Sequence, residues 1–162
     1  YDGNSATQVR DAFALSTNLS SKEDRGLANL QAAYDYLEDE MGATKIGVIG
    51  WCLGGKWSLK TALMLPEDID ATVIYYGSLT DDKDKLATLD MPIIGFVGTK
   101  DRLHKEFIVF DENMKELGKD SSVYIYEGAK HAFANASGTV YEPVAAEDSW
   151  SKTTKFLKKY LH

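Results

Sequence analysis

The stretch Lys45-Ile46-Gly47-Val48-Ile49-Gly50-Trp51-Cys52-Leu53-Gly54-Gly55-Lys56 decides the fold, because an apolar run ends there at a cysteine flanked by glycines. The β-branched residues of the run favour a strand, and the glycines permit a turn too sharp for side chains. A helical pattern follows at once. Such a turn holds the side chain of Cys52 out at the carboxyl end of the sheet, beside the positive end of the helix dipole, which favours a thiolate. The pattern Gly-x-Cys-x-Gly over residues 50–54 therefore predicts a nucleophile elbow.

A second interpretation of Cys52 stays open at this point. A lone cysteine in a globular domain is usually a small buried hydrophobe. The elbow interpretation is favoured because strand, glycines and helix come in the required order, and because partners for a thiol follow further along the chain.

Composition limits the class of protein. With 162 residues and 44% hydrophobic content, we expect one domain over residues 1–162 with a full core. No run is long and apolar enough for a membrane span and no signal sequence opens the chain, so we expect a soluble, cytoplasmic protein. A net charge of −7 argues against nucleic acid or an anionic membrane as a partner. A single cysteine forms no internal disulfide.

Helical patterns precede the elbow. Ser5–Gln8 has the form of a capping box before a short apolar face. The same signal recurs at Ser20–Glu23, and apolar residues spaced by three and four then predict a helix that ends at Gly42. The elbow strand covers Lys45–Ile49.

Strands and helices alternate after the elbow. Apolar and β-branched runs predict three more strands, and periodic patterns predict helices after the elbow, after the third strand and from Pro143 onward. An acidic segment between the second and third strands is expected to be exposed. This alternation predicts an α/β fold, a three-layer sandwich with a mostly parallel sheet and helices on both faces. The predicted strands cover residues 71–77, 92–98 and 123–126, and the middle helix covers residues 105–117.

Three chemically useful side chains follow ends of these strands. Cys52 comes after the first strand, Asp101 after the third and His131 after the fourth, at the sheet edge where functional groups of parallel sheets collect. Histidine can take the thiol proton and return it to a leaving group, and a carboxylate can orient the imidazole. The other histidines, His104 and His162, are expected at the surface and at the chain end.

Each partner has a structural alternative. His131 can be an ordinary loop histidine, and Asp101 can cap the helix that follows it. Asp81 and Asp82, after the second strand, are rival acids. Asp101 is preferred because Gly98 and the strand before it make a defined exit. No His, Cys or carboxylate spacing matches a known metal site.

Three motifs together resemble the dienelactone hydrolases, the cysteine branch of the α/β-hydrolase fold. These motifs are Gly50-Trp51-Cys52-Leu53-Gly54-Gly55, Gly98-Thr99-Lys100-Asp101 and Gly128-Ala129-Lys130-His131-Ala132-Phe133. The resemblance implies a triad of Cys52, His131 and Asp101 that hydrolyses a small ester or lactone through a thioester, without a cofactor. The backbone N–H of Leu53 is implied as an oxyanion-hole donor.

The chain departs from the family pattern in two ways. Family members are commonly longer at the amino end, and that part contributes the first strands and a second oxyanion donor, so a shortened hydrolase fold with weak activity is expected. Asn135 stands where dienelactone-specific members carry an arginine, which favours neutral esters. The elbow strand is expected at a sheet edge, covered by residues before Leu27 or by a second copy in a homodimer.

Two further functions remain as alternatives. A hydrolase fold without turnover would serve as a binding or interaction module. A redox-sensing thiol is the third possibility, although the chain has no resolving cysteine.

Overall fold

The computed structural model describes residues 5–7 and 9–162, and the chain divides into two compact units, residues 1–43 and 44–162. The first unit is helical: α1 covers Val9–Ser20, α2 covers Glu23–Asp35, and a π-helical turn, η1, covers Tyr36–Glu40. Gly42 follows with a φ of 64°, the left-handed conformation expected after a helix end. The helix predicted to end at Gly42 is therefore confirmed, with a change to π-helical hydrogen bonding in its last turn.

The capping box predicted at the start of α2 is wrong. α2 begins at Glu23 after Lys22, which makes no side-chain cap, and the hydroxyl of Ser21 donates instead to a carbonyl of α1 at 2.7 Å. Ser20 is the last residue of α1, so its backbone is not in the extended conformation that an N-cap residue adopts. The other predicted capping box includes Gln8, which lies outside the described residues.

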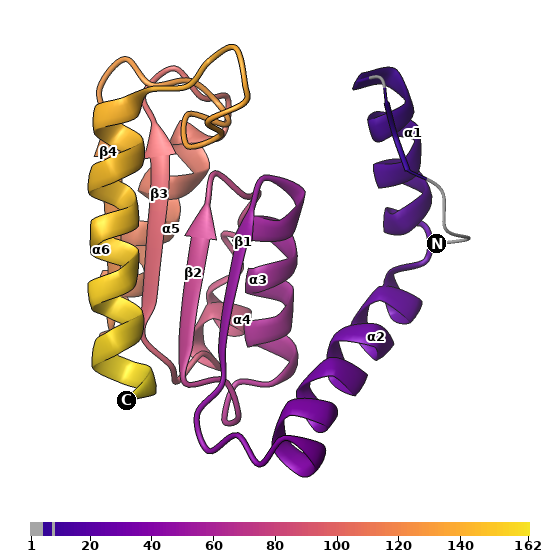
Figure 1. Ribbon diagram of the computed structural model, residues 1–162. Helices are drawn as coiled ribbons and strands as arrows, with labels where there is room; N and C mark the ends of the chain where they lie inside the picture. Colours follow the sequence, from indigo (N-terminus) through magenta and orange to yellow (C-terminus); the bar gives the residue numbers. More distant parts are fainter. Residues whose placement is uncertain (1–4, 8) are drawn as a thin grey trace. The chain divides into compact units, whose positions relative to one another are not determined.

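The second unit is built on a parallel sheet in the order β1-β2-β3-β4 (Figure 1). Every residue of the central strands β2 and β3 is buried, whereas the edge strands β1 and β4 are partly exposed. The four predicted strands are confirmed, with small shifts at their ends. They are β1 (Gly47–Trp51), β2 (Ala71–Tyr75), β3 (Ile93–Gly98) and β4 (Ser121–Tyr126).

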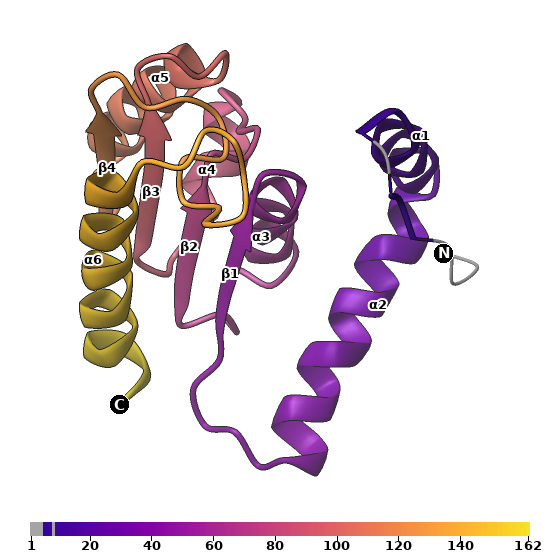
Figure 2. The ribbon, with the colours of Figure 1, turned by 45° about the horizontal axis from the view of Figure 1, so that its top comes forward.

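Helices cover both faces of this sheet. α3 (Leu53–Met64) packs against β1 and β2, and α5 (His104–Glu116) packs against β3 and β4 on the same face. α6 (Pro143–Leu161) lies on the opposite face, in front of the sheet in Figure 1 and beside it in Figure 2. The predicted three-layer α/β sandwich is confirmed, and Pro143 stands in the first turn of α6 as expected.

The acidic segment between β2 and β3 is exposed at most of its acidic residues, as expected, but it also holds a helix and buried apolar residues that were not predicted. A short helix, α4, covers Lys83–Ala87 and is capped by the carboxylate of Asp82. Leu86, Leu89 and Met91 are buried. The acidic residues face solvent, but the three apolar residues between them anchor the segment to the core.

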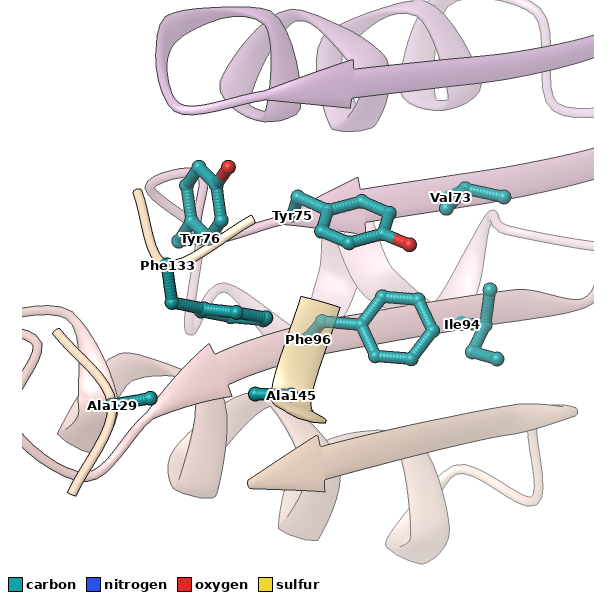
Figure 3. Close-up of a cluster of buried hydrophobic side chains, with 8 residues drawn as sticks. All are labelled: Val73, Tyr75, Tyr76, Ile94, Phe96, Ala129, Phe133 and Ala145. Atoms are coloured by element: carbon teal, nitrogen blue, oxygen red, sulfur yellow. The ribbon is translucent and has the colours of Figure 1, made fainter. Parts of the chain in front are cut away.

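The core on the α6 face is rich in aromatic rings. Figure 3 shows its centre, where Tyr75, Phe96 and Phe133 lie among smaller apolar side chains. The Tyr75 and Phe96 rings are 4.6 Å apart, and the Tyr75 hydroxyl is 2.7 Å from Thr153 Oγ1 on α6. The buried tyrosine thus keeps a hydrogen-bond partner while its ring ties α6 to the sheet.

Three expectations stay predictions at this point. No helix among the described residues is long and apolar enough to cross a membrane, and the cytoplasmic location stays a prediction. The single-domain organisation is also untested. β1 does lie at a sheet edge, while its cover, by the amino-terminal residues or by a second copy, stays a prediction.

Candidate active site

The cysteine lies at a strained turn between β1 and α3. Cys52 has φ 54° and ψ −115°, a backbone conformation that is uncommon for a residue with a side chain. Its N–H donates to the carbonyl of Tyr75 at 2.9 Å, and its carbonyl accepts from the N–H of Lys56 at 3.2 Å. The turn is therefore held from the neighbouring strand and from the first turn of α3. The thiol is exposed, so the interpretation of Cys52 as a buried hydrophobe is wrong.

Of the two glycines at the ends of the elbow pattern, only one lies where a side chain would clash. A Cβ on Gly50 would lie 2.2 Å from the backbone of Gly54 and 2.7 Å from the hydroxyl of Ser58. A Cβ on Gly54 would meet nothing within 4 Å. The sharp turn depends on the close backbone approach at Gly50.

The segments at the carboxyl ends of β3 (residues 98–101) and β4 (residues 126–131), called the exits of these strands, are joined by hydrogen bonds. The N–H of Thr99 donates to Tyr126 at 2.9 Å, and its hydroxyl accepts from the N–H of Gly128 at 2.8 Å. The approach is so close that a Cβ on Gly98 would lie 2.1 Å from the carbonyl oxygen of Ala129. These contacts bring the residues after β3 beside those after β4.

The three predicted side chains form one hydrogen-bonded line. His131 Nε2 is 3.0 Å from Cys52 Sγ, and His131 Nδ1 is 2.8 Å from Asp101 Oδ2. The Asp101 side chain is fully buried, and the imidazole is 31% exposed. The line therefore runs from the buried carboxylate to the exposed thiol.

The rival residues take other positions. The carboxylate of Asp82 accepts from backbone N–H groups of α4, and Asp81 uses its carbonyl to accept from Asn113. Asp101 is not the cap of α5, whose N-cap residue is Leu103 with no side-chain cap. Its Oδ1 accepts from the N–H of Leu103, just before the helix, while Oδ2 bonds to the imidazole. His104 is the first residue of α5.

The contacts along the line shift the pKa values of all three groups. Hydrogen bonding to His131 lowers the pKa of the Cys52 thiol against the effect of burial, and a backbone hydrogen bond from Leu53 adds to the lowering. The bond to Asp101, followed by the bond to Cys52, raises the pKa of His131 to about 9. Burial raises the pKa of Asp101, but the bonds from His131 and Leu103 outweigh it and leave this pKa below its usual value. The arrangement favours a thiolate beside an imidazolium.

One neighbour of the imidazole was missed by the sequence analysis. The ring of Tyr76 lies 5.2 Å from the His131 ring, and Tyr76 has a φ of 37°. The sequence placed Tyr76 in the strand predicted over residues 71–77, in a segment that resembles the family, and predicted no role for it at the site. Two adjacent aromatic residues before a glycine, where strand alternation would send them to opposite faces, were the available signal.

No grouping of His, Cys, Asp and Glu side chains suited to a metal ion is found among the described residues. That no cofactor is needed stays a prediction.

Known proteins resemble the chain over almost its full length. The model of the dienelactone hydrolase family matches residues 1–161. "Protein usf" of Aquifex pyrophilus is 33% identical over 99% of this chain and 72% of its own length. A Bradyrhizobium sp protein named "Probable 2-oxo-3-(5-oxofuran-2-ylidene)propanoate lactonase" is 33% identical over 94% of this chain and 67% of its own length.

The fold has solved counterparts. The dienelactone hydrolase-like promiscuous phosphotriesterase P91, from metagenomic libraries, aligns with a TM-score of 0.80 at 18% identity, over 96% of this chain and 70% of its own. The fold is that of an α/β-hydrolase. Within that class, the chain belongs to the dienelactone hydrolase family.

Proposed function

We propose that the chain hydrolyses small esters or lactones with Cys52 as the nucleophile, His131 as general base and acid, and Asp101 as the group that orients the imidazole. The hydrogen-bonded line of these three side chains, with contacts of 3.0 and 2.8 Å, is the observation that carries the proposal. Membership of a family of ester and lactone hydrolases supports the reaction class. The proposed chemistry needs no cofactor.

The first half-reaction forms a thioester. The Cys52 thiolate attacks the carbonyl carbon, and the carbonyl oxygen becomes an oxyanion that accepts a hydrogen bond from the N–H of Leu53. When the tetrahedral intermediate collapses, the bond to the alcohol oxygen breaks and His131 Nε2 gives its proton to that oxygen. The alcohol leaves, and the acyl group stays on Cys52.

The second half-reaction returns the enzyme to its starting state. The neutral imidazole takes a proton from water at Nε2 while the water oxygen attacks the thioester carbon. The carbon–sulfur bond then breaks, and the carboxylic acid leaves the thiolate of Cys52 beside a protonated His131. Asp101 accepts from Nδ1 throughout and keeps Nε2 directed at the sulfur.

Small, neutral esters are the substrates that we expect. Asn135, at the position where dienelactone-specific relatives are expected to carry arginine, accepts hydrogen bonds from the N–H and hydroxyl of Ser137 through Oδ1. Its side chain is occupied within its own loop and brings no positive charge to pair with a substrate carboxylate.

Turnover of p-nitrophenyl acetate by the wild type and two variants tests the proposal. We expect C52A and H131A each to lose nearly all turnover, because one removes the nucleophile and the other its base. H104A, which removes the histidine at the start of α5, is the matched control and keeps wild-type turnover. Mass spectrometry of the quenched wild-type reaction should find an acetyl group on the peptide that holds Cys52. Full turnover by C52A, or a folded wild type inactive toward short esters and lactones, would overturn the proposal.

A further inference from the structure

Backbone strain in the described part of the chain gathers at the candidate site. Its non-glycine residues with positive φ are Cys52 at 54°, Tyr76 at 37° and Ala132 at 67°. Cys52 carries the thiol, and Ala132 directly follows His131. Strained backbone conformations persist where the surrounding structure enforces them, and they concentrate at functional sites. Tyr76 has no part in the chemistry described so far, so its strain calls for another reason.

The positive φ of Tyr76 changes the direction of its side chain. Successive side chains of a strand point to opposite faces of the sheet. Tyr75 ends β2, and yet Tyr75 and Tyr76 belong to the same buried cluster, with Tyr76 next to Phe133 at the end of the strand (Figure 3). The unusual backbone brings the second ring to the face and the level where the loop after β4 carries His131.

The Tyr76 ring is held firmly in that place. Tyr76 is only 2% exposed, and its backbone N–H donates to the carbonyl of Phe96 at 2.7 Å. The ring meets Phe133 edge-on at a centroid distance of 5.4 Å and lies 5.2 Å from the imidazole of His131, with 60° between the planes. The imidazole therefore has a fixed aromatic wall beside it.

The neighbouring aromatic ring limits a motion of the imidazole that the two hydrogen bonds leave free. The bonds from His131 to Asp101 and Cys52 hold the two ring nitrogens on a line, but the ring can still tilt away from that line. Such a tilt would bend both bonds away from linearity and admit water between the partners. A neighbouring ring limits that motion and excludes water from one side of the imidazole.

We propose that Tyr76 is a positioning residue whose aromatic ring holds the imidazole of His131 in line between Asp101 and Cys52. This inference rests on the proposed function, because it assigns the ring to the same hydrogen-bonded line. We assign the role to the ring; the hydroxyl makes a separate hydrogen bond to the backbone of Ala134, three residues beyond His131.

The reactivity of the single cysteine toward iodoacetamide, measured against pH, tests the inference without any turnover. In the wild type, the bond to His131 should place the apparent thiol pKa below the free-thiol value of about 8.5. We expect Y76F, which keeps the ring, to retain the wild-type pKa. Y76L should raise it toward the value found in H131A. With p-nitrophenyl acetate, Y76L should lower kcat on the order of 10- to 100-fold with KM little changed, and Y76F should restore kcat.

Controls separate positioning from general loss of packing. F110L removes a buried ring from α5, on the other face of the sheet, and should lower the melting temperature without moving the thiol pKa. Y76M, which fills similar space without a planar ring, replaces Y76L if that variant does not fold, with the same expected shift.

A folded Y76L or Y76M with the wild-type thiol pKa would overturn the inference. A Y76F as impaired as Y76L would overturn it too, because the hydroxyl would then be the active part. If the wild type turns over no ester while Y76L still raises the thiol pKa, the proposed function fails and the positioning role stands.

Discussion

The elbow after β1 and the paired exits of β3 and β4 bring their side chains together by different means. At the elbow, backbone geometry places Cys52, with a positive φ and a close approach between Gly50 and Gly54. At the exits, the bonds of the Asp101 carboxylate to Leu103 and His131 orient the side chains. A single added methyl group can break a close backbone approach altogether, whereas each hydrogen bond contributes only part of the free energy that holds a side chain in position. A substitution at Gly50, or at Gly98 where the exits also approach closely, should therefore disrupt the site abruptly, whereas the loss of one hydrogen bond at the exits should weaken it gradually.

The largest expected effect comes from a single methyl group at the elbow. In G50A, the new Cβ would lie 2.2 Å from the backbone of Gly54, so the strand and the start of α3 must separate. We expect a loss of about 3 kcal/mol or more in the free energy of unfolding, together with loss of esterase turnover, measured by urea denaturation and a p-nitrophenyl acetate assay.

G54A is the matched control for this prediction. A Cβ on Gly54 meets nothing within 4 Å, and alanine suits the first turn of α3 better than glycine does. Its free energy of unfolding should equal or exceed that of the wild type. If G50A were as stable as G54A, the elbow would not depend on the close approach, and the contrast with the exits would collapse.

The next largest effect is expected from D101N, which replaces the carboxylate that bonds to the imidazole with an uncharged amide of the same shape. An amide in place of the carboxylate neither stabilises the imidazolium nor keeps Nδ1 as the donor, so we expect kcat/KM to fall on the order of 10²- to 10⁴-fold. D82N changes a carboxylate that caps α4. Because asparagine caps helices as well as aspartate does, D82N should keep both turnover and stability.

The pH dependence of kcat/KM is a second measurement that separates D101N from D82N. The pKa of His131 is raised to about 9, chiefly by Asp101. As pH rises through that value, Nε2 loses the proton destined for the leaving alcohol, so wild-type activity should fall above about pH 9. In D101N the falling limb should move to lower pH, and in D82N it should stay. A D101N profile with the wild-type limb would mean that Asp101 does not tune the imidazole.

Much of this arrangement was readable from the sequence, because the signals were local. The run that ends at Cys52 and the glycines around it specify strand, turn and helix within twelve letters. The order of strands along the chain then placed Asp101 and His131 at one edge of a parallel sheet. Asp101 and His131 are neighbours because β3 and β4 are neighbours, and the alternation of strands and helices gave a reason to expect that.

The features that were missed depend on tertiary contacts. α4 is shorter than two helical turns, and its stability comes from burying Leu86, which no short periodic pattern reveals. The capping box at Ser20 fails because α1 extends further than its own pattern suggested. The ring of Tyr76 reaches His131 only through a positive φ that sequence alternation argues against.

The smallest effect should come from the hydroxyl that joins the two exits. T99V keeps the side-chain shape but removes the oxygen that accepts from the N–H of Gly128 at 2.8 Å, three residues before His131. Because that half-buried N–H loses its partner, we expect about 1 kcal/mol less free energy of unfolding and a smaller fall in kcat/KM than in D101N.

T88V, which removes an exposed hydroxyl bonded to the carbonyl of Lys85, is the control and should change the free energy of unfolding by less than about 0.5 kcal/mol. A T99V variant that loses turnover as completely as G50A would show that the exits, like the elbow, tolerate no adjustment, since one hydrogen bond would then decide the position of His131.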